Sequence, residues 1–203
     1  MERSELLSAL KTVYSLLKQR KYPEALEVFQ NLYYKYPDEP DVLYNFGIVL
    51  NALRDYIGGA RVLEKLVSID PEYENGKVAL GYSYINMDKV EEGIAILEDA
   101  RASDPDNLLI LETLGAGYGK TNRFELALEI FSRAESLQPA SRPTQYALAQ
   151  TLCSLNRYQE ASRHLKIIID EGIDDKIDGE AKDLQREISS IAHSPDDLQK
   201  MTD

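Results

Sequence analysis

Proline recurs in this chain at a constant interval, with four prolines that each stand 34 residues after the one before: Pro37, Pro71, Pro105 and Pro139. Glycine follows the same period at Gly47, Gly81 and Gly115. A fixed period of this length is typical of repeat arrays, in which each unit buries its apolar face by stacking on its neighbours. The period therefore predicts a solenoid, and it makes function a question about surfaces.

The apolar spacing inside one period predicts two helices. In residues 40–73 the apolar positions first follow one helix face, at Leu43, Phe46, Gly47 and Leu50. The same spacing returns after a polar break at Arg54 and stops at Pro71, because proline cannot continue a helix. The predicted fold class is therefore all-α, with five helix–turn–helix units at 6–39, 40–73, 74–107, 108–141 and 142–175.

Small residues recur at one place on each predicted helix. The first helices have Gly47, Gly81, Gly115 and Ala149, and the second have Ala25, Gly59, Gly93, Ala127 and Ala161. Glycine inside a helix costs about 0.5–1 kcal/mol relative to alanine. Its recurrence at one register therefore predicts a close approach between neighbouring helices.

One more helix is predicted after the fifth unit, over 176–193. Its apolar residues repeat at four- and three-residue intervals: Ile177, Ala181, Leu184, Ile188 and Ile191. A single apolar stripe suits a helix that caps the last unit, and Asp174 or Asp175 suits its N-cap. Residues 194–203 are predicted to be a disordered acidic tail.

The residues at these places resemble the tetratricopeptide repeat family over 6–175. The fourth unit carries the family pattern most fully, at Leu111, Leu114, Gly115, Tyr118, Ala127, Phe131, Ala134 and Pro139. The first unit departs from it at Val13, where the family has a small residue, and the fifth has Ile173 in place of the closing proline. The resemblance implies a right-handed superhelix that binds proteins and has no enzymatic activity.

The resemblance also implies a concave groove lined by the first helix of each unit, at its fifth, ninth and twelfth places. These places and one neighbouring asparagine supply the candidate partner-binding residues: Leu10, Tyr14, Tyr44, Ile48, Asn51, Val78, Tyr82, Ile85, Asn86 and Tyr146. The first three units thus present an apolar trough with tyrosines, and Asn51 and Asn86 are polar handles. Tyrosine favours recognition surfaces because it combines a large apolar area with a hydroxyl at low entropy cost.

The composition of the chain excludes several classes of partner and cofactor. The net charge of −12 should repel phosphate backbones, so nucleic acid is not an expected partner. No stretch approaches the roughly 18 apolar residues of a membrane span. The single Cys153 cannot form an intramolecular disulfide, and with His164 and His193 it does not make a zinc site. We therefore expect no cofactor, no metal, and a reducing location that is cytoplasmic or cytosol-facing and peripheral.

The segment Gly115–Thr121 looks like a phosphate-binding loop, because it ends in Gly-Lys-Thr. That motif needs a further glycine five residues before Gly119, where this chain has Leu114. The segment is therefore interpreted as a helix with extra glycines rather than a nucleotide site. No nucleophile and base stand in a recognisable pattern either, so the sequence does not predict an enzyme.

Two classes of function fit this sequence. The first is an adaptor or chaperone that binds a partner's peptide or helix in the groove. The second is a scaffold that assembles with further copies of itself. The adaptor is the preferred interpretation, and the scaffold is the alternative. The segment 81–128 resembles magnetosome-associated tetratricopeptide scaffolds through Val90-Glu-Glu-Gly93 and Pro105-Asp-Asn107, which keeps the alternative open. A family branch that grips C-terminal carboxylates needs lysine where this chain has Tyr44, and it is disfavoured.

Overall fold

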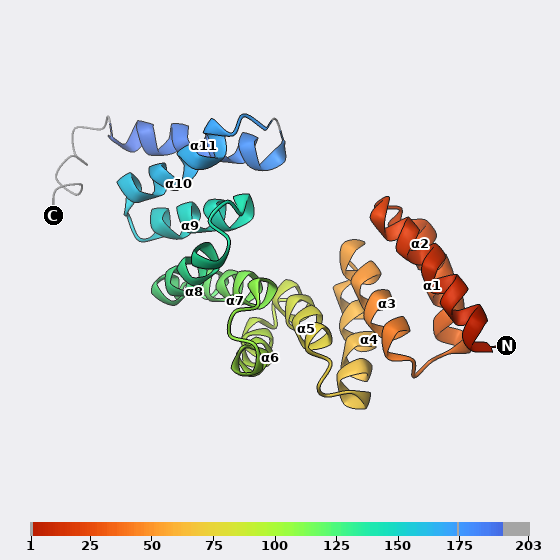
Figure 1. Cartoon of the computed structure of the whole chain (residues 1–203). Coiled ribbons are helices and arrows are strands. Elements are labelled where there is room, and N and C mark those ends of the chain that lie inside the picture. Colours follow the sequence, from red (N-terminus) through yellow and green to blue (C-terminus); the bar gives the residue numbers. More distant parts are fainter. Residues whose placement is uncertain (1, 174, 193–203) are drawn as a thin grey trace. The chain divides into compact units, whose positions relative to one another are not determined.

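The computed structural model describes residues 2–173 and 175–192, and within them the chain forms eleven α-helices (Figure 1). In chain order these are α1 (Glu2–Lys18), α2 (Tyr22–Lys35), α3 (Pro40–Ala52), α4 (Tyr56–Ile69), α5 (Glu74–Asn86), α6 (Val90–Ser103), α7 (Leu108–Lys120), α8 (Phe124–Leu137), α9 (Arg142–Ser154), α10 (Tyr158–Asp170) and α11 (Lys176–Ala192). The all-α class and the array of helix pairs are confirmed. The predicted tail at 194–203 lies outside the described residues.

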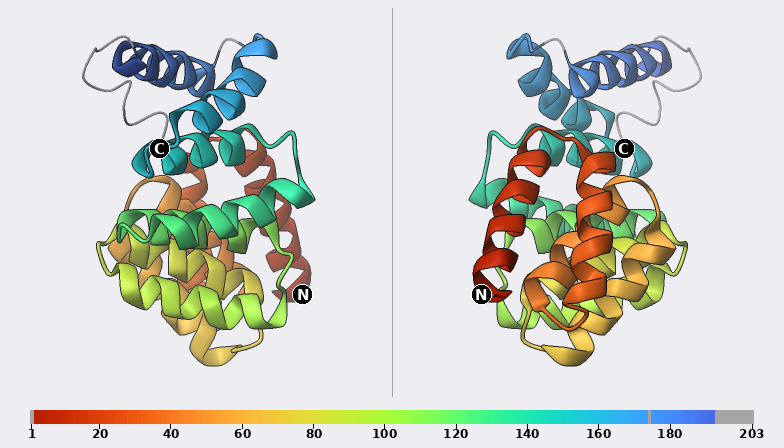
Figure 2. Two further views of the ribbon diagram at one scale, coloured as in Figure 1. Left: turned by 90° about the vertical axis from the view of Figure 1, so that its left-hand side faces the viewer. Right: turned by 90° about the vertical axis from the view of Figure 1, so that its right-hand side faces the viewer.

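The helices divide into two compact units. The first unit runs to Ser103 and holds α1 to α6, and the second begins at Asp104 and holds α7 to α11. Within each unit, consecutive helices run antiparallel and pack side by side (Figure 2). The core of the first unit includes the fully buried Phe29, Leu43 and Leu63. In the second unit, Leu165 and other apolar side chains of α9, α10 and α11 form a core cluster.

Each helix pair turns on a residue with a left-handed backbone. These residues also recur every 34 positions, at Arg20, Arg54, Asp88, Asn122 and Asn156, with φ between 56° and 64°. In the first pair, the Arg20 N–H donates to the Leu17 carbonyl at 2.9 Å, and the Lys21 N–H donates to the Leu16 carbonyl at 3.0 Å. This pattern is the Schellman motif, which satisfies the last carbonyls of a helix. It reverses the chain tightly enough for the second helix to pack on the first.

Two glycines of the predicted register sit where a side chain would collide. A β-carbon at Gly81 would lie 2.6 Å from Leu97 Cγ, and one at Gly115 would lie 2.7 Å from Phe131 Cε1. Real β-carbons do not approach other atoms so closely, and Leu97 is fully buried. The predicted close approach between paired helices is therefore confirmed.

Helix α11 is anchored at its start by an N-cap and by an arginine of α9. The Asp178 N–H donates to Asp175 Oδ1 at 2.9 Å, so Asp175 caps α11. Arg142, at the start of α9, bonds Asp175 Oδ1 at 2.8 Å and Glu171 Oε2 at 2.9 Å. Ala181 and Ile188 of α11 are buried in the core cluster of the second unit. Helix α11 thus packs on the last helix pair through its apolar stripe.

Candidate functional site

The first helices of the first unit expose tyrosine rings. Tyr14 on α1 and Tyr82 on α5 keep 41% and 42% of their surface in contact with solvent. Tyr44 and Ile48 on α3 are half-buried and pack against the core. This surface therefore contains side chains that pack against the core and tyrosine rings that remain partly exposed to solvent.

Two ring contacts join neighbouring repeats at this surface. The rings of Tyr44 on α3 and Tyr73, just before α5, have centroids 5.4 Å apart. Tyr56, the first residue of α4, meets Tyr82 of α5 edge-on at 6.2 Å. Aromatic pairs at such distances contribute about 0.5–1.5 kcal/mol beyond their buried area. We call the set Tyr14, Tyr44, Tyr56, Tyr73 and Tyr82 the tyrosine surface.

Polar contacts orient the hydroxyls of the tyrosine surface. Asn45 Nδ2 donates to the Tyr14 hydroxyl at 3.3 Å and to the Asp41 carbonyl at 2.8 Å. The Tyr73 hydroxyl donates to Asp41 Oδ1 at 3.4 Å. Burial, and then the charge of Asp41, raises the pKa of Tyr73 to about 12. Burial also raises the pKa of Tyr44 and Tyr82, so these hydroxyls are protonated at neutral pH and can donate hydrogen bonds.

Three of the sequence-predicted groove residues are instead core residues. Leu10, Val78 and Ile85 are 5%, 1% and 3% exposed. Their assignment to a partner-binding surface is corrected, because a side chain with so little exposed area offers a partner almost nothing to contact. They share their places in the repeat with Tyr44 or Asn51, so place alone does not decide which residue faces outward.

Asn51 is also a structural residue rather than a polar handle. Its side chain is 6% exposed, and its Nδ2 donates to the Ala79 carbonyl at 3.3 Å. Its Oδ1 accepts from Ser83 Oγ at 2.9 Å, so Asn51 joins α3 to α5. Asn86 is half-exposed and donates to the Tyr82 carbonyl of its own helix at 2.8 Å. Tyr146 belongs to the second unit, where it packs against the core cluster there.

Sequence reasoning missed Tyr73. It occupies the place before a first helix, where Asn107 and Ser141 stand in the fourth and fifth repeats and cap α7 and α9 with their side chains. Tyr73 makes no side-chain cap on α5. A ring at a place that suits a capping residue is the signal in the sequence, and it went unused because only helix registers were compared.

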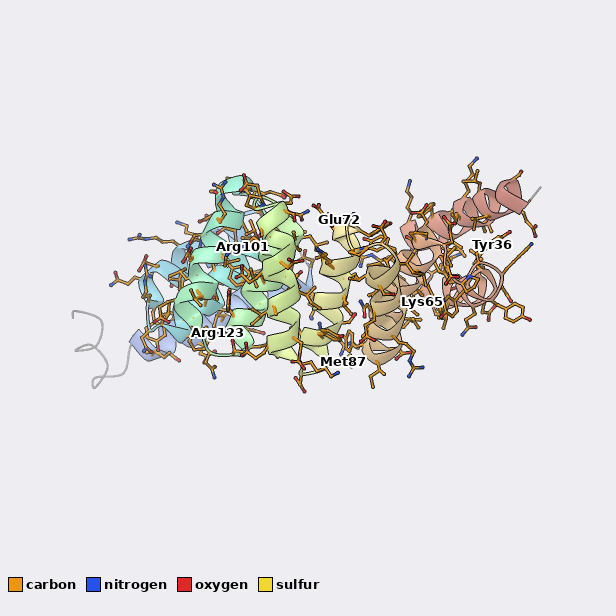
Figure 3. All side chains as sticks on the ribbon, turned by 90° about the horizontal axis from the view of Figure 1, so that it is seen from below. Tyr36, Lys65, Glu72, Met87, Arg101 and Arg123 are labelled. Carbon is orange, nitrogen blue, oxygen red and sulfur yellow. The ribbon has the colours of Figure 1, made fainter. Side chains whose placement is uncertain are left out.

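The second helices carry a different surface, rich in charged side chains. Lys65 on α4, labelled in Figure 3, bonds Asp38 at 2.9 Å and lies 5.3 Å from the Tyr33 ring centroid. Asp99 of the second helix α6 bonds Lys77 of the first helix α5 at 2.7 Å. The carboxylates of both pairs are exposed, and ion pairs open to solvent contribute about 0–1 kcal/mol and favour solubility more than recognition.

The structure gives Cys153 the properties of a packing residue. Burial, and then the charge of Glu187, raises the pKa of its thiol to about 11, so the reactive thiolate is scarce at neutral pH. In the described part of the chain, no group of three His, Cys, Asp or Glu side chains is placed to hold a metal ion. Each helix in that part falls short of the length and apolar character needed to cross a bilayer.

The stacked helix pairs define an α-helical repeat protein, a class whose fold is used for binding other proteins. A family model described as tetratricopeptide repeat matches residues 10–74. Over these residues the chain carries tetratricopeptide repeats.

Among curated proteins, the chain is similar to the peroxisomal targeting signal receptor of Eremothecium gossypii, with 30% identity over 135 residues. It is also similar to intraflagellar transport protein 70A of Xenopus tropicalis, with 22% identity over 195 residues. These matches cover 64% and 80% of this chain but only 23% and 30% of those proteins. The chain therefore spans less than a third of the length of these relatives.

Among solved structures, MamA of Desulfovibrio magneticus RS-1 matches 84% of this chain and 97% of its own, with a TM-score of 0.70 and 20% identity. A thermophilic TPR protein of Thermus thermophilus matches 91% of this chain and 97% of its own, with a TM-score of 0.75 and 20% identity. At this identity the likeness shows the fold alone.

Proposed function

We propose that this chain is a non-enzymatic interaction module that binds a peptide or helix of a partner protein on the tyrosine surface of the first unit. One observation carries the proposal: Tyr14 and Tyr82 expose about two-fifths of their surface on first helices, although the core of these helices is already filled. Apolar area left exposed in a cluster usually marks an interaction site.

The chemistry of the surface suits a polypeptide ligand. Tyrosine rings offer a rigid apolar contact with only two side-chain torsions to immobilise. Their protonated hydroxyls can donate to backbone carbonyls of a bound segment, while Asn86 supplies a half-exposed amide beside Tyr82. The name of the Eremothecium relative describes a receptor for a targeting signal, which supports recognition of a segment of another protein.

The experiment begins with peptides selected from a displayed random library on the full chain, followed by measurement of their affinity. The double variant Tyr44→Ala with Tyr82→Ala should weaken binding at least tenfold, since truncating a buried aromatic anchor costs about 2 kcal/mol or more. The matched control is Glu91→Lys with Glu92→Lys, which changes two exposed side chains of α6. Circular dichroism should show wild-type helicity for all variants. If the lysine pair abolishes binding and the alanine pair leaves it intact, the proposal is wrong.

The alternative function is a scaffold that assembles with further copies of itself. It rests on the sequence resemblance of 81–128 to magnetosome-associated tetratricopeptide scaffolds. Sedimentation of the full chain over a range of concentrations separates the two functions. A mass that rises with concentration and falls back in the tyrosine double variant indicates self-assembly through this surface.

We also propose that the protein is located in a reducing, cytoplasmic environment, because its single cysteine fits one.

A further inference from the structure

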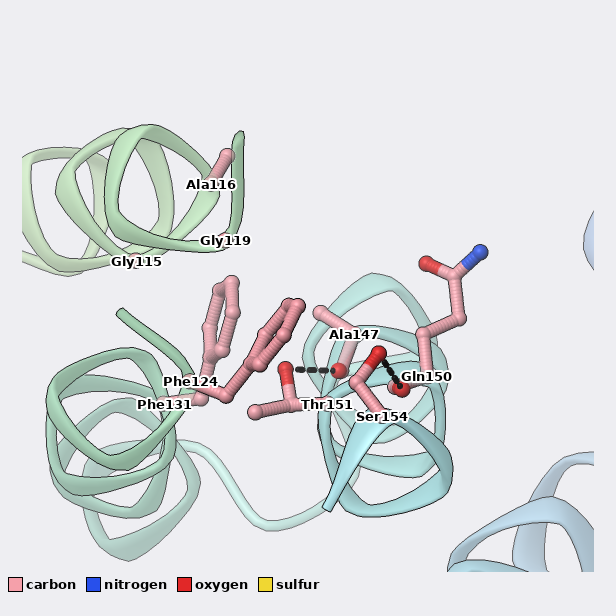
Figure 4. Close-up of a pocket in the computed structure, with 9 residues that line it drawn as sticks. All are labelled: Gly115, Ala116, Gly119, Phe124, Phe131, Ala147, Gln150, Thr151 and Ser154. Carbon is pink, nitrogen blue, oxygen red and sulfur yellow. Dashed lines mark hydrogen bonds between the residues drawn. The ribbon is translucent and has the colours of Figure 1, made fainter. Parts of the chain in front are cut away.

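The second unit contains a cavity of about 290 Å³ between α7, α8 and α9 (Figure 4). Helix α7 contributes only small residues to its wall, Gly115, Ala116 and Gly119. The rings of Phe124 and Phe131 rise from α8 into the space between α7 and α9 (Figure 4). The cavity thus has an aromatic floor and one wall without bulky side chains.

Gly119 is not required by the packing of the protein. A β-carbon at Gly119 would meet no other group within 4 Å, whereas one at Gly115 would collide with Phe131. Glycine inside a helix is about 1 kcal/mol less favourable than alanine. Gly115 is therefore explained by close helix packing, while Gly119 lines the cavity and no packing contact requires a glycine there.

The lining selects an uncharged ligand. None of the residues that line the cavity is charged, although charged residues make up 29% of the chain. Thr151 Oγ1 donates to the Ala147 carbonyl at 2.8 Å, and Ser154 Oγ donates to the Gln150 carbonyl at 3.1 Å. Each hydroxyl has one hydrogen to donate, so towards a ligand these two groups act as acceptors.

The size of the cavity suits a single ring system better than a large cofactor. Pockets for drug-sized ligands hold about 300–1,000 Å³, so this cavity lies at the lower edge of that range. An apolar cavity of about 150 Å³ already accepts benzene. A single ring system with one hydrogen-bond donor fits the volume, the aromatic floor and the two acceptors. We propose that this cavity binds a tryptophan side chain presented by a partner polypeptide.

The chain contains no tryptophan, so the indole fluorescence of a probe can be followed without background. The probe is an acetylated and amidated Gly-Ser-Trp-Ser-Gly peptide, titrated with the full chain. We expect saturable binding, together with shifts of the backbone amide resonances of Gly119 and Thr151. The matched peptide with leucine in place of tryptophan should not displace the probe. Absence of saturation, or shifts confined to the first unit, would overturn the proposal.

Two helical glycines provide a matched pair of variants. Gly119→Leu places a side chain in the cavity, and Gly179→Leu adds the same side chain on α11, where a β-carbon also meets nothing within 4 Å. The first should weaken probe binding at least tenfold, and the second should leave it unchanged. Both replace helical glycine with a better helix former, so a thermal melt should show that both remain folded. Equal affinity of the two variants contradicts the proposal.

This site and the tyrosine surface stand on different units and are tested separately. Tyr44→Ala with Tyr82→Ala should leave binding of the tryptophan probe unchanged, while Gly119→Leu should leave peptides selected for the tyrosine surface unaffected. If Gly119→Leu weakens binding of the tryptophan probe but the tyrosine double variant still binds its selected peptides, the cavity is supported and the tyrosine surface is rejected. The opposite result supports the tyrosine surface and rejects the cavity.

Discussion

The two units carry side chains of different size at the same places of the repeat. At the ninth and twelfth places the third repeat has Tyr82 and Ile85, and the fourth has Ala116 and Gly119. At the ninth place the first unit has Tyr14, Ile48 and Tyr82, whereas the second unit has Ala116 and Gln150. The backbone register is common to both units, while side-chain volume decides whether a ring projects or a cavity opens. This difference shows that a shared register does not determine the chemistry of the surface.

The units also begin their first helices differently. In the second unit, Asn107 and Ser141 accept hydrogen bonds from the first backbone amides of α7 and α9. In the first unit, Glu39 and Tyr73 precede α3 and α5 without a side-chain cap. A cap contributes about 0.5–2 kcal/mol. The first unit therefore forgoes cap stability at Tyr73, where the ring instead completes the tyrosine surface.

The largest expected effect is on the free energy of unfolding. It distinguishes Gly81, which stands at a close contact between two helices, from Gly119, which does not. Gly81→Leu forces carbon atoms towards the fully buried Leu97 and should lower the free energy of unfolding by roughly 1–3 kcal/mol through overpacking. Gly119→Leu should raise it slightly, since helix propensity improves and no atom is in the way. Denaturant titration of both variants measures the contrast. Similar midpoints for the two would mean that the close approach at Gly81 has no energetic weight.

A smaller effect tests the missing cap. Tyr73→Asn and Tyr73→Ala both remove the ring contact with Tyr44, but only asparagine can accept from the first amides of α5. We therefore expect Tyr73→Asn to be more stable than Tyr73→Ala by about 1 kcal/mol. Asn107→Ala should lose a similar amount in the second unit, where the cap is present. Both variants at position 73 should bind selected peptides more weakly than wild type. Equal stability of the two would show that this place does not act as a cap.

Much of the fold was predictable because the residues that recur in the repeat are proline and glycine, which strongly affect backbone conformation. Proline ended the second helices, and glycine at one register predicted contacts that the collisions at Gly81 and Gly115 confirm. The surface was less predictable. Tyr44 and Val78 share the fifth place of their repeats, yet Val78 is 1% exposed and Tyr44 is half-buried at the surface. Burial at that place depends on side-chain length and on the neighbouring helix, and the period specifies neither.

Other features of the structure came from outside the helix registers. Tyr73 reaches Tyr44 from a distant part of the sequence and from a place that no helix pattern includes. The cavity beside Gly119 is lined by residues of three helices, α7, α8 and α9, whose arrangement no single repeat place specifies. The sequence did single out this glycine-rich segment, as a helix with extra glycines. That interpretation of the helix is confirmed, and the space beside it became visible only when α7 was placed against α8 and α9.

The smallest effect concerns the turns within the helix pairs. The first unit places Arg20 in a left-handed backbone with φ 56°, and the second places Asn122 there with φ 58°. A left-handed backbone costs an ordinary residue about 1–2 kcal/mol, and asparagine less, because its short side chain bonds locally. Arg20→Asn should therefore stabilise the chain by about 0.5 kcal/mol, part of that cost. The mirror change Asn122→Arg should destabilise it by a similar amount. Both residues are exposed, so packing changes little, and denaturant titration of the two variants and their double mutant measures the exchange. If both variants change the free energy of unfolding in the same direction, the identity of the turn residue does not account for a difference in stability between the units.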